Sequence, residues 1–140
     1  MTREDALTRY ARFYAEMSPD SIGKLPALCS AQVRFRDPFN DFTGVDKMIA
    51  LFEEMYRELE APRFEVTDRA VGTEACYLRW TMYFRRKGRT WKILGLSEIH
   101  FDEAGRVTAH FDHWDSGSQF YARLPLLGGV IRWIARKLAV

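Results

Sequence analysis

The chain has 140 residues, enough for one ordinary domain that buries about two-thirds of its unfolded surface. Aromatic residues make up 14% and charged residues 29%, which is typical of a packed globular core and excludes a disordered chain. Lys and Arg number 21 against 19 Asp and Glu, a balance that argues against a nucleic-acid-binding protein. No apolar run reaches the ~18 residues of a membrane span, and the charged start lacks the apolar core of a secretory signal. We therefore expect a cytoplasmic protein.

Two helices and a strand are predicted in the first part of the chain. Thr2 and Asp5 form a capping box, and Ser18 before Pro19 predicts the cap of a second, short helix. Residues 33–38 alternate between apolar and charged side chains and predict a short strand that ends at its proline. The apolar residues of the first helix recur on one face: Leu7, Tyr10, Tyr14 and Met17.

A third helix and a four-stranded meander follow. Thr43 and Asp46 form another capping box, which predicts a helix that Pro62 ends. The Lys87-Gly88 pair is typical of a tight hairpin turn. A period of two predicts four strands, at residues 63–71, 75–86, 90–101 and 106–115. These elements predict an α+β fold, a cone-shaped barrel in which a curved antiparallel sheet wraps around the N-terminal helices and leaves a ligand pocket at one end.

The end of the chain has a pattern of its own. Residues 1–123 are predicted to form one domain, to which residues 124–140 are appended as an amphipathic helix. Basic residues accompany its apolar stripe, which consists of Leu127, Ile131, Ile134 and Leu138. Three roles stay open for this helix: it covers the pocket mouth, it packs against a partner subunit, or it makes a weak contact with a membrane surface.

The strands also predict which side chains face the pocket. One face of residues 75–86 is almost wholly apolar, and it consists of Cys76, Leu78, Trp80, Met82 and Phe84. Neither face of residues 106–115 is cleanly apolar, so polar groups there must be enclosed in a cavity or an interface. A buried carboxylate is costly unless it is paired or hydrogen-bonded. Asp112 or Asp115 is therefore expected to have a role that explains this cost, and Asp112 shares its strand face with His110 and Trp114.

A metal site is not expected from the sequence. His110 and Asp112 share one strand face and His113 and Asp115 share the opposite one, so no face collects three ligands. The two cysteines lie far apart without metal-type spacing and are predicted to be buried free thiols.

The resemblance of this chain to a known family rests on residues 33–39, the Gly44-Val45 helix start and residues 97–107. Together with the order of the elements over residues 1 to about 120, these segments resemble the nuclear transport factor 2-like superfamily, in its SnoaL-like and ketosteroid-isomerase-like branch. The resemblance implies the same cone-shaped fold, a hydrophobic small-molecule ligand, no cofactor and a homodimer. Proteins of this fold include isomerases, cyclases, epoxide hydrolases, dehydratases and proteins without catalysis.

The resemblance also implies roles for particular residues. Isomerases of this group use an aspartate base in an Asp-Pro pair at the end of the first strand, a place that Asp37 fills, and a tyrosine of the first helix, to which Tyr14 is adjacent. Asp112 resembles the late-strand carboxylate of cyclases and epoxide hydrolases, with His110 beside it. The implied substrate-binding residues are Trp80, Met82, Phe84, Ser97 and Trp114, of which Ser97 stands where the isomerases carry a protonated acid.

Two carboxylates in an apolar pocket can perform acid–base chemistry, because burial and mutual repulsion raise the pKa of one of them. We expect a cofactor-free isomerase or cyclase that acts on a hydrophobic, carbonyl-bearing ligand, with Asp37 as the base and Asp112 or His110 as its partner. The alternative is a non-catalytic ligand-binding or dimerisation module, in which Asp37 holds the turn before Asn40 and Asp112 forms a salt bridge. A peripheral membrane protein that uses residues 124–140 is a further alternative.

Overall fold

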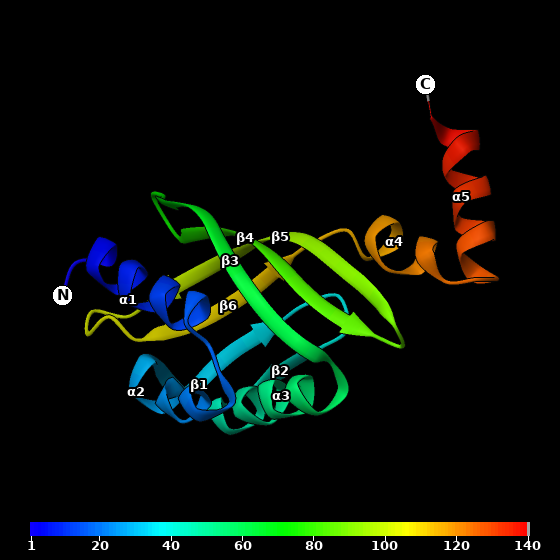
Figure 1. Ribbon diagram of the computed structural model, residues 1–140. Coiled ribbons are helices and arrows are strands. Elements are labelled where there is room, and N and C mark those ends of the chain that lie inside the picture. Colours follow the sequence, from blue (N-terminus) through cyan, green and yellow to red (C-terminus); the bar gives the residue numbers. More distant parts are fainter. Residues whose placement is uncertain (140) are drawn as a thin grey trace.

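A computed structural model describes residues 1–139, and Figure 1 shows a curved sheet, helices packed beside it and an arm that extends from one end. The helices are α1 (Arg3–Ala15), α2 (Leu25–Leu28), α3 (Val45–Glu58), α4 (Ser116–Gln119) and α5 (Leu127–Leu138). The strands are β1 (Cys29–Arg36), β2 (Asp41–Thr43), β3 (Glu60–Val71), β4 (Cys76–Arg86), β5 (Arg89–Phe101) and β6 (Val107–His113). Short 3-10 turns occupy Pro19–Lys24 and Tyr121–Arg123.

The strands form one sheet in the order β2-β1-β6-β5-β4-β3. Neighbours from β3 to β6 are antiparallel, as the meander predicted, and the α+β class is confirmed. Two details differ from the prediction. β1 runs parallel to β6, so the sheet is mixed, and β2 and β3 are free edges, so the sheet does not close into a barrel. The parallel pair escaped prediction because no short turn joins β1 to β6, and only a short turn fixes the direction of a neighbouring strand.

Local signals in the sequence set several element boundaries correctly and others wrongly. Pro62 does not end the third helix as predicted, because α3 ends at Glu58 and Pro62 lies in β3. The Thr2 hydroxyl accepts a hydrogen bond from the Asp5 amide at 3.0 Å, so the predicted cap of α1 is confirmed. Lys87 and Gly88 have φ angles of 51° and 73°, the left-handed conformation that a two-residue hairpin turn requires. The predicted cap at Thr43 is wrong: Thr43 pairs with Arg34 in β2, and Gly44 stands at the N-cap of α3 without a side-chain bond.

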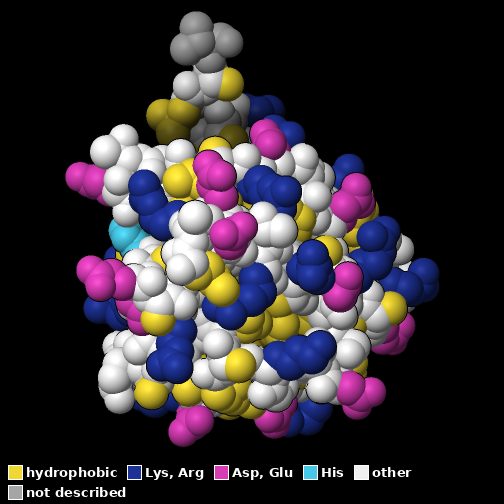
Figure 2. All heavy atoms as spheres, turned by 90° about the vertical axis from the view of Figure 1, so that its left-hand side faces the viewer, with side chains coloured by type: hydrophobic (Ala, Val, Ile, Leu, Met, Phe, Trp, Pro, Cys, Tyr) yellow, Lys and Arg dark blue, Asp and Glu magenta, His cyan; other side chains and the backbone are white. Residues whose placement is uncertain are grey.

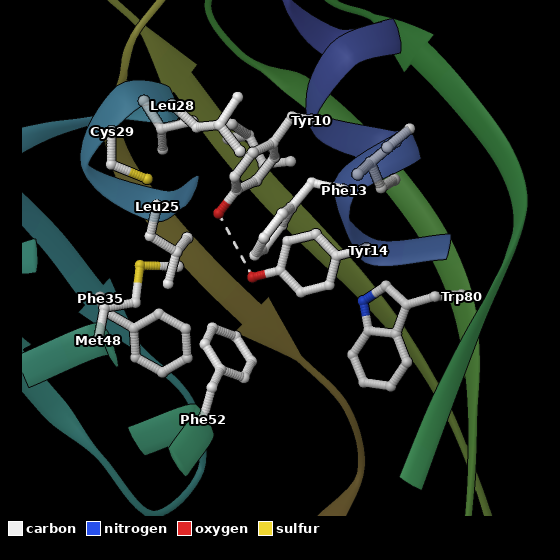
Figure 3. Close-up of a cluster of buried hydrophobic side chains, with 14 of the residues drawn as sticks. Tyr10, Phe13, Tyr14, Leu25, Leu28, Cys29, Phe35, Met48, Phe52 and Trp80 are labelled. Carbon is white, nitrogen blue, oxygen red and sulfur yellow. Dashed lines mark hydrogen bonds between the residues drawn. The ribbon is translucent and has the colours of Figure 1, made fainter. Parts of the chain in front are cut away.

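The core lies between the concave face of the sheet and helices α1, α2 and α3 (Figure 3). The predicted inner face of β4 is confirmed, because Cys76, Leu78, Trp80 and Phe84 are all buried. Both cysteines are buried free thiols, as predicted. On the face shown in Figure 2, at the end that carries the N-terminus, basic and acidic side chains are interspersed, so no uniformly basic surface is seen there.

The C-terminal segment differs from the single helix predicted over residues 124–140. Asp115 caps the short helix α4 by accepting a hydrogen bond from the Ser118 amide at 3.1 Å, and α5 begins only after Pro125, which cannot continue a helix from the preceding turn. Val140 lies outside the described residues. Figure 1 shows α5 standing away from the sheet, and no residue of α5 lines the apolar cavity described below. None of the helices in residues 1–139 is long and apolar enough to cross a membrane.

Candidate functional site

An apolar cavity of about 380 Å³ lies between α3 and the inner faces of β3, β4 and β5, a size suited to a small organic molecule. Four side chains that the sequence predicted as substrate-binding line it: Trp80, Met82, Phe84 and Trp114. Asp37 and Asp112 also line it, and the same two carboxylates border a shallow hollow of about 510 Å³ that is more open to solvent. The two acids therefore stand where the apolar cavity meets water.

Gly95 on β5 allows the Trp80 side chain to lie flat inside this wall. A Cβ atom at Gly95 would sit 2.4 Å from the Trp80 ring, a contact that no side chain tolerates. The indole is thereby placed with its Nε1 donating to the Ser97 hydroxyl at 2.9 Å. Ser97 itself is buried behind the cavity wall and does not line the cavity.

Asp112 is held by hydrogen bonds from two other side chains of the sheet. Its Oδ1 atom accepts a hydrogen bond from the Ser97 hydroxyl at 2.5 Å and another from His110 Nε2 at 2.7 Å. The Asp112 side chain is 18% exposed, whereas the His110 side chain is 1% exposed. Within the described part of the chain, its Oδ2 atom receives no hydrogen bond.

Two tyrosines of α1 stand behind His110. The Tyr10 hydroxyl lies 2.8 Å from His110 Nδ1, and the Tyr14 hydroxyl lies 3.5 Å from the same atom and 3.3 Å from the Tyr10 oxygen. Figure 3 shows these two hydroxyls facing each other inside the core. Burial raises the pKa of both tyrosines well above the ordinary value, so both hydroxyls stay protonated and act as donors.

The chemistry of an indole and of a carboxylate fixes the direction of the hydrogen bonds that lead to Asp112. An indole N–H can only donate, so Ser97 accepts from Trp80 and gives its own hydrogen to Asp112. A carboxylate can only accept, so His110 Nε2 donates to Asp112. In the tautomer that carries its hydrogen on Nε2, Nδ1 accepts from the Tyr10 hydroxyl. The chain of hydrogen bonds through Ser97 and the chain through His110 both end on Asp112 Oδ1. They fix the carboxylate in place without occupying its second oxygen.

Asp37 is held by its own turn at the end of β1. Its Oδ1 atom accepts hydrogen bonds from the Phe39 amide at 2.8 Å and the Asn40 amide at 2.7 Å. The Asn40 side-chain amide lies 3.1 Å from Oδ1 and 3.2 Å from Oδ2. Burial raises the pKa of Asp37 and the charge of Asp112 adds to this effect, while the hydrogen bonds from Phe39 and Asn40 oppose it. Asp37 thus combines the turn role with a position on the cavity wall.

The structure separates the predicted residues into two groups. Asp37 and Asp112 line the cavity, whereas His110, Tyr14 and Ser97 do not line it. Ser97 and His110 are each hydrogen-bonded to Asp112. Tyr10 was not singled out as a candidate, although it lies closer to His110 than Tyr14 does. The sequence indicates that Tyr10 lies beside Tyr14, because it precedes Tyr14 by four residues on the same helical face. Within residues 1–139, no group of three or more His, Cys, Asp or Glu is placed to hold a metal ion.

Comparison with known proteins places the chain in a family. The model of the SnoaL-like domain matches residues 10–110, well over half of the sequence. The chain belongs to the SnoaL-like domain family. No curated protein sequence matches this SnoaL-like domain.

Solved structures show the same fold at low sequence identity. An NTF2-like protein of unknown function from Burkholderia pseudomallei K96243 has a TM-score of 0.70 and 15% identity, over 84% of this chain and 95% of that one. A putative SnoaL-like polyketide cyclase from Shewanella putrefaciens CN-32 has a TM-score of 0.67 and 16% identity, over 85% and 96%. An epoxide hydrolase of the LEH-like type from M. tuberculosis has a TM-score of 0.66 and 14% identity, over 96% of each chain. These likenesses establish the fold of the SnoaL-like domain, and its chemistry has to be argued from the site.

Proposed function

We propose that this SnoaL-like domain binds a hydrophobic, carbonyl-bearing small molecule and removes a proton from the carbon next to the carbonyl, as isomerases and cyclases do, without a cofactor. One observation carries the proposal. Asp112 lines an apolar cavity of about 380 Å³ and is fixed by two hydrogen bonds to Oδ1, while none of residues 1–139 donates a hydrogen bond to its Oδ2 atom. A positioned base of this kind raises the rate of proton transfer by roughly 10²- to 10⁴-fold.

Asp112 and Asp37 divide the acid and base roles in this proposal. The resemblance implies Asp37 as the base, but both oxygens of Asp37 already contact Asn40, whereas Asp112 keeps one oxygen unbonded. Asp112 is therefore assigned as the base. The C–H bond breaks, its proton moves to Asp112 Oδ2, and the electron pair moves to the carbonyl oxygen. Asp37, whose pKa is raised by burial, donates a proton to that oxygen.

The enol formed in this way has two outcomes. In a ligand with a double bond conjugated to the enol, return of the proton from Asp112 to a different carbon isomerises the ligand, and the enol proton goes back to Asp37. Alternatively, the enol carbon attacks a second carbonyl of the same molecule and closes a ring; the enol proton again returns to Asp37, and the new alkoxide takes the proton held by Asp112. Both outcomes need a ligand that is held flat and kept away from bulk water. The aromatic side chains of Trp80, Phe84 and Trp114 supply such a surface.

The charges around the cavity support an uncharged ligand. Besides Asp37, which this proposal keeps protonated, the acidic residues in the lining are Glu54, Glu58 and Asp112, and among residues 1–139 the one basic side chain in the lining is Arg86. An anionic ligand would be repelled by this excess of negative charge. A neutral ketone or polyketone fits both the apolar walls and the charge.

Deuterium exchange tests the proposal without knowledge of the natural substrate. The probe is 2-tetralone, a bicyclic ketone, in D₂O, and NMR follows the loss of the hydrogens next to its carbonyl. The wild-type chain should accelerate this exchange above buffer, and Asp112→Asn should remove the acceleration. Asp102→Asn is the matched control, because Asp102 accepts hydrogen bonds from Ala104 and Arg106 in an exposed turn outside the cavity. Absence of acceleration, or full acceleration in Asp112→Asn, would contradict the proposal.

Addition of water to an epoxide is a second candidate. The observation that favours it is the open hollow shared by Asp37 and Asp112, because it lets water reach both carboxylates. Asp112 would take a proton from the water and Asp37 would protonate the opening ring. Formation of the diol from styrene oxide, measured with the same variants, separates this reaction from proton exchange.

A further inference from the structure

Exposed apolar side chains are concentrated in the C-terminal arm, the segment that follows residue 115 and contains α4 and α5. Six of the large hydrophobic residues that the fold leaves exposed lie between residues 126 and 138: Leu126, Leu127, Val130, Trp133, Ile134 and Leu138. Leu138 is 78% exposed and Trp133 is 55% exposed. Such a patch on a protein surface marks a site of interaction with another molecule or a membrane.

The exposed residues of the arm form a stripe along α5. Leu127, Val130, Ile134 and Leu138 are spaced by three or four positions, which places them on one side of the helix, and Trp133 lies next to them. Among the described residues, α5 packs on α4 and on the Tyr121–Arg123 turn, where Arg132 also donates a hydrogen bond to the Ala122 carbonyl. Figure 1 shows that the sheet does not cover it.

The arm and the body differ in charge. Residues 1–115 contain 19 acidic and 17 basic side chains, whereas residues 116–140 contain four basic side chains and no acidic one. These four are Arg123, Arg132, Arg136 and Lys137. A basic helix with an apolar stripe and a tryptophan is typical of helices that lie at the boundary between lipid headgroups and acyl chains.

We propose that α5 binds the surface of an anionic lipid membrane, with its apolar stripe among the acyl chains and Arg136 and Lys137 at the phosphates. Its twelve residues extend about 18 Å, too short to span the bilayer, so the helix lies in the plane of the surface. A second copy of the chain is a poorer occupant, because two arms would bring their like charges together. The proposal is independent of the chemistry assigned to the cavity.

Vesicle sedimentation tests the proposal on the full chain. Vesicles of equal parts phosphatidylglycerol and phosphatidylcholine should bind the wild-type chain, and pure phosphatidylcholine vesicles should bind it at least tenfold less well. Two variants should each lower binding at least tenfold: Arg136→Glu with Lys137→Glu, which reverses the charge, and Val130→Glu with Ile134→Glu, which interrupts the stripe. Lys47→Glu with Lys87→Glu is the matched control for net charge, because both lysines are exposed on the body. The control should bind as the wild-type chain does.

Three results would overturn the proposal. The first is no binding of the wild-type chain to the anionic vesicles, and the second is equal loss of binding in the control and in the charge-reversed arm. The third concerns a second copy as occupant: a dimer in lipid-free solution that Val130→Glu with Ile134→Glu converts into a monomer, as measured by light scattering. Circular dichroism melting of each variant confirms that the body remains folded.

Discussion

Asp37 and Asp112 line the same cavity, but the chain holds the two carboxylates in different ways. Asp37 accepts hydrogen bonds from Phe39 and Asn40, its near neighbours in the sequence. Asp112 accepts from Ser97 and His110, and the donors behind them come from β4 and α1. One carboxylate is fixed by a local turn and the other by the tertiary structure.

This difference separates the role of a turn from the role of a site. A turn needs an acceptor for its amides, which an aspartate at that position provides at little cost. The buried network around Asp112 Oδ1 forms only if several helices and strands are correctly placed; its members are Trp80, Ser97, His110 and Tyr10. A buried polar group in it that lost its hydrogen-bond partner would lower the stability of the fold. The presence of this network in the core is explained if the Oδ2 atom of Asp112 has a function.

The largest expected effect is the contrast between two amide variants. Asp112→Asn removes the base, so exchange of 2-tetralone should fall by roughly 10²- to 10⁴-fold. Its amide oxygen still accepts from Ser97 and His110, so the fold should persist. Asp37→Asn should lower exchange by a smaller factor, since it removes the acid and keeps the base. A larger loss in Asp37→Asn would reverse the two assignments.

The network behind Asp112 predicts an effect on stability. Tyr10→Phe removes the donor 2.8 Å from His110 Nδ1 and should lower the free energy of unfolding by about 1–3 kcal/mol, because it leaves a buried nitrogen without its partner. Tyr14→Phe should cost less, since its hydroxyl is 3.5 Å away from that nitrogen. Urea unfolding of both variants measures the difference. A greater cost for Tyr14→Phe would show that the network is wrongly assigned.

The raised pKa of Asp37 predicts a dependence of stability on pH. The folded chain holds the Asp37 proton more tightly than the unfolded chain does, so this group stabilises the fold below its ordinary pKa of 3.8. That stabilisation is lost as the pH rises through the raised pKa. Asp37→Asn does not titrate, so its stability relative to the wild-type chain should increase as the pH rises from the ordinary pKa of 3.8 through the raised pKa of Asp37. A relative stability that falls over this interval would show that the carboxylate is stabilised in its charged form.

The smallest effect concerns the buried thiols. Burial raises the pKa of Cys29 to about 12 and also raises the pKa of Cys76. Because the thiolate is the reactive form, neither thiol should react with a disulfide reagent in the folded chain at about pH 8. Both should react after unfolding in urea. Rapid labelling of the folded chain would mean that α1 and β1 separate readily.

Much of the fold could be predicted because its signals are local or periodic. The Lys87-Gly88 turn and the Thr2 cap depend on a few adjacent residues, and the inner face of β4 depends on an alternation that the strand geometry imposes. Thr43 misled the prediction because a capping pattern also fits a short edge strand. Pairing with Arg34 placed Thr43 in β2.

The site was less accessible to prediction than the fold. His110 and Asp112 attracted attention as polar residues on an enclosed strand face, but their partners cannot be deduced from spacing. Tyr10 lies 100 positions before His110, and Ser97 meets Asp112 across the pairing of β5 with β6. The sequence also could not predict that α5 lies away from the cavity. An amphipathic stripe predicts that the helix makes an apolar contact, but it does not identify the surface that the helix contacts.

A crystal structure with 2-tetralone bound tests the central claim most directly. The account predicts that the ketone fills the cavity beside Trp80 and Trp114, with the carbon next to its carbonyl at Asp112 Oδ2 and its carbonyl oxygen toward Asp37. A cavity filled by protein side chains, or an Asp112 Oδ2 atom hydrogen-bonded to the protein and turned away from the ketone, would contradict it.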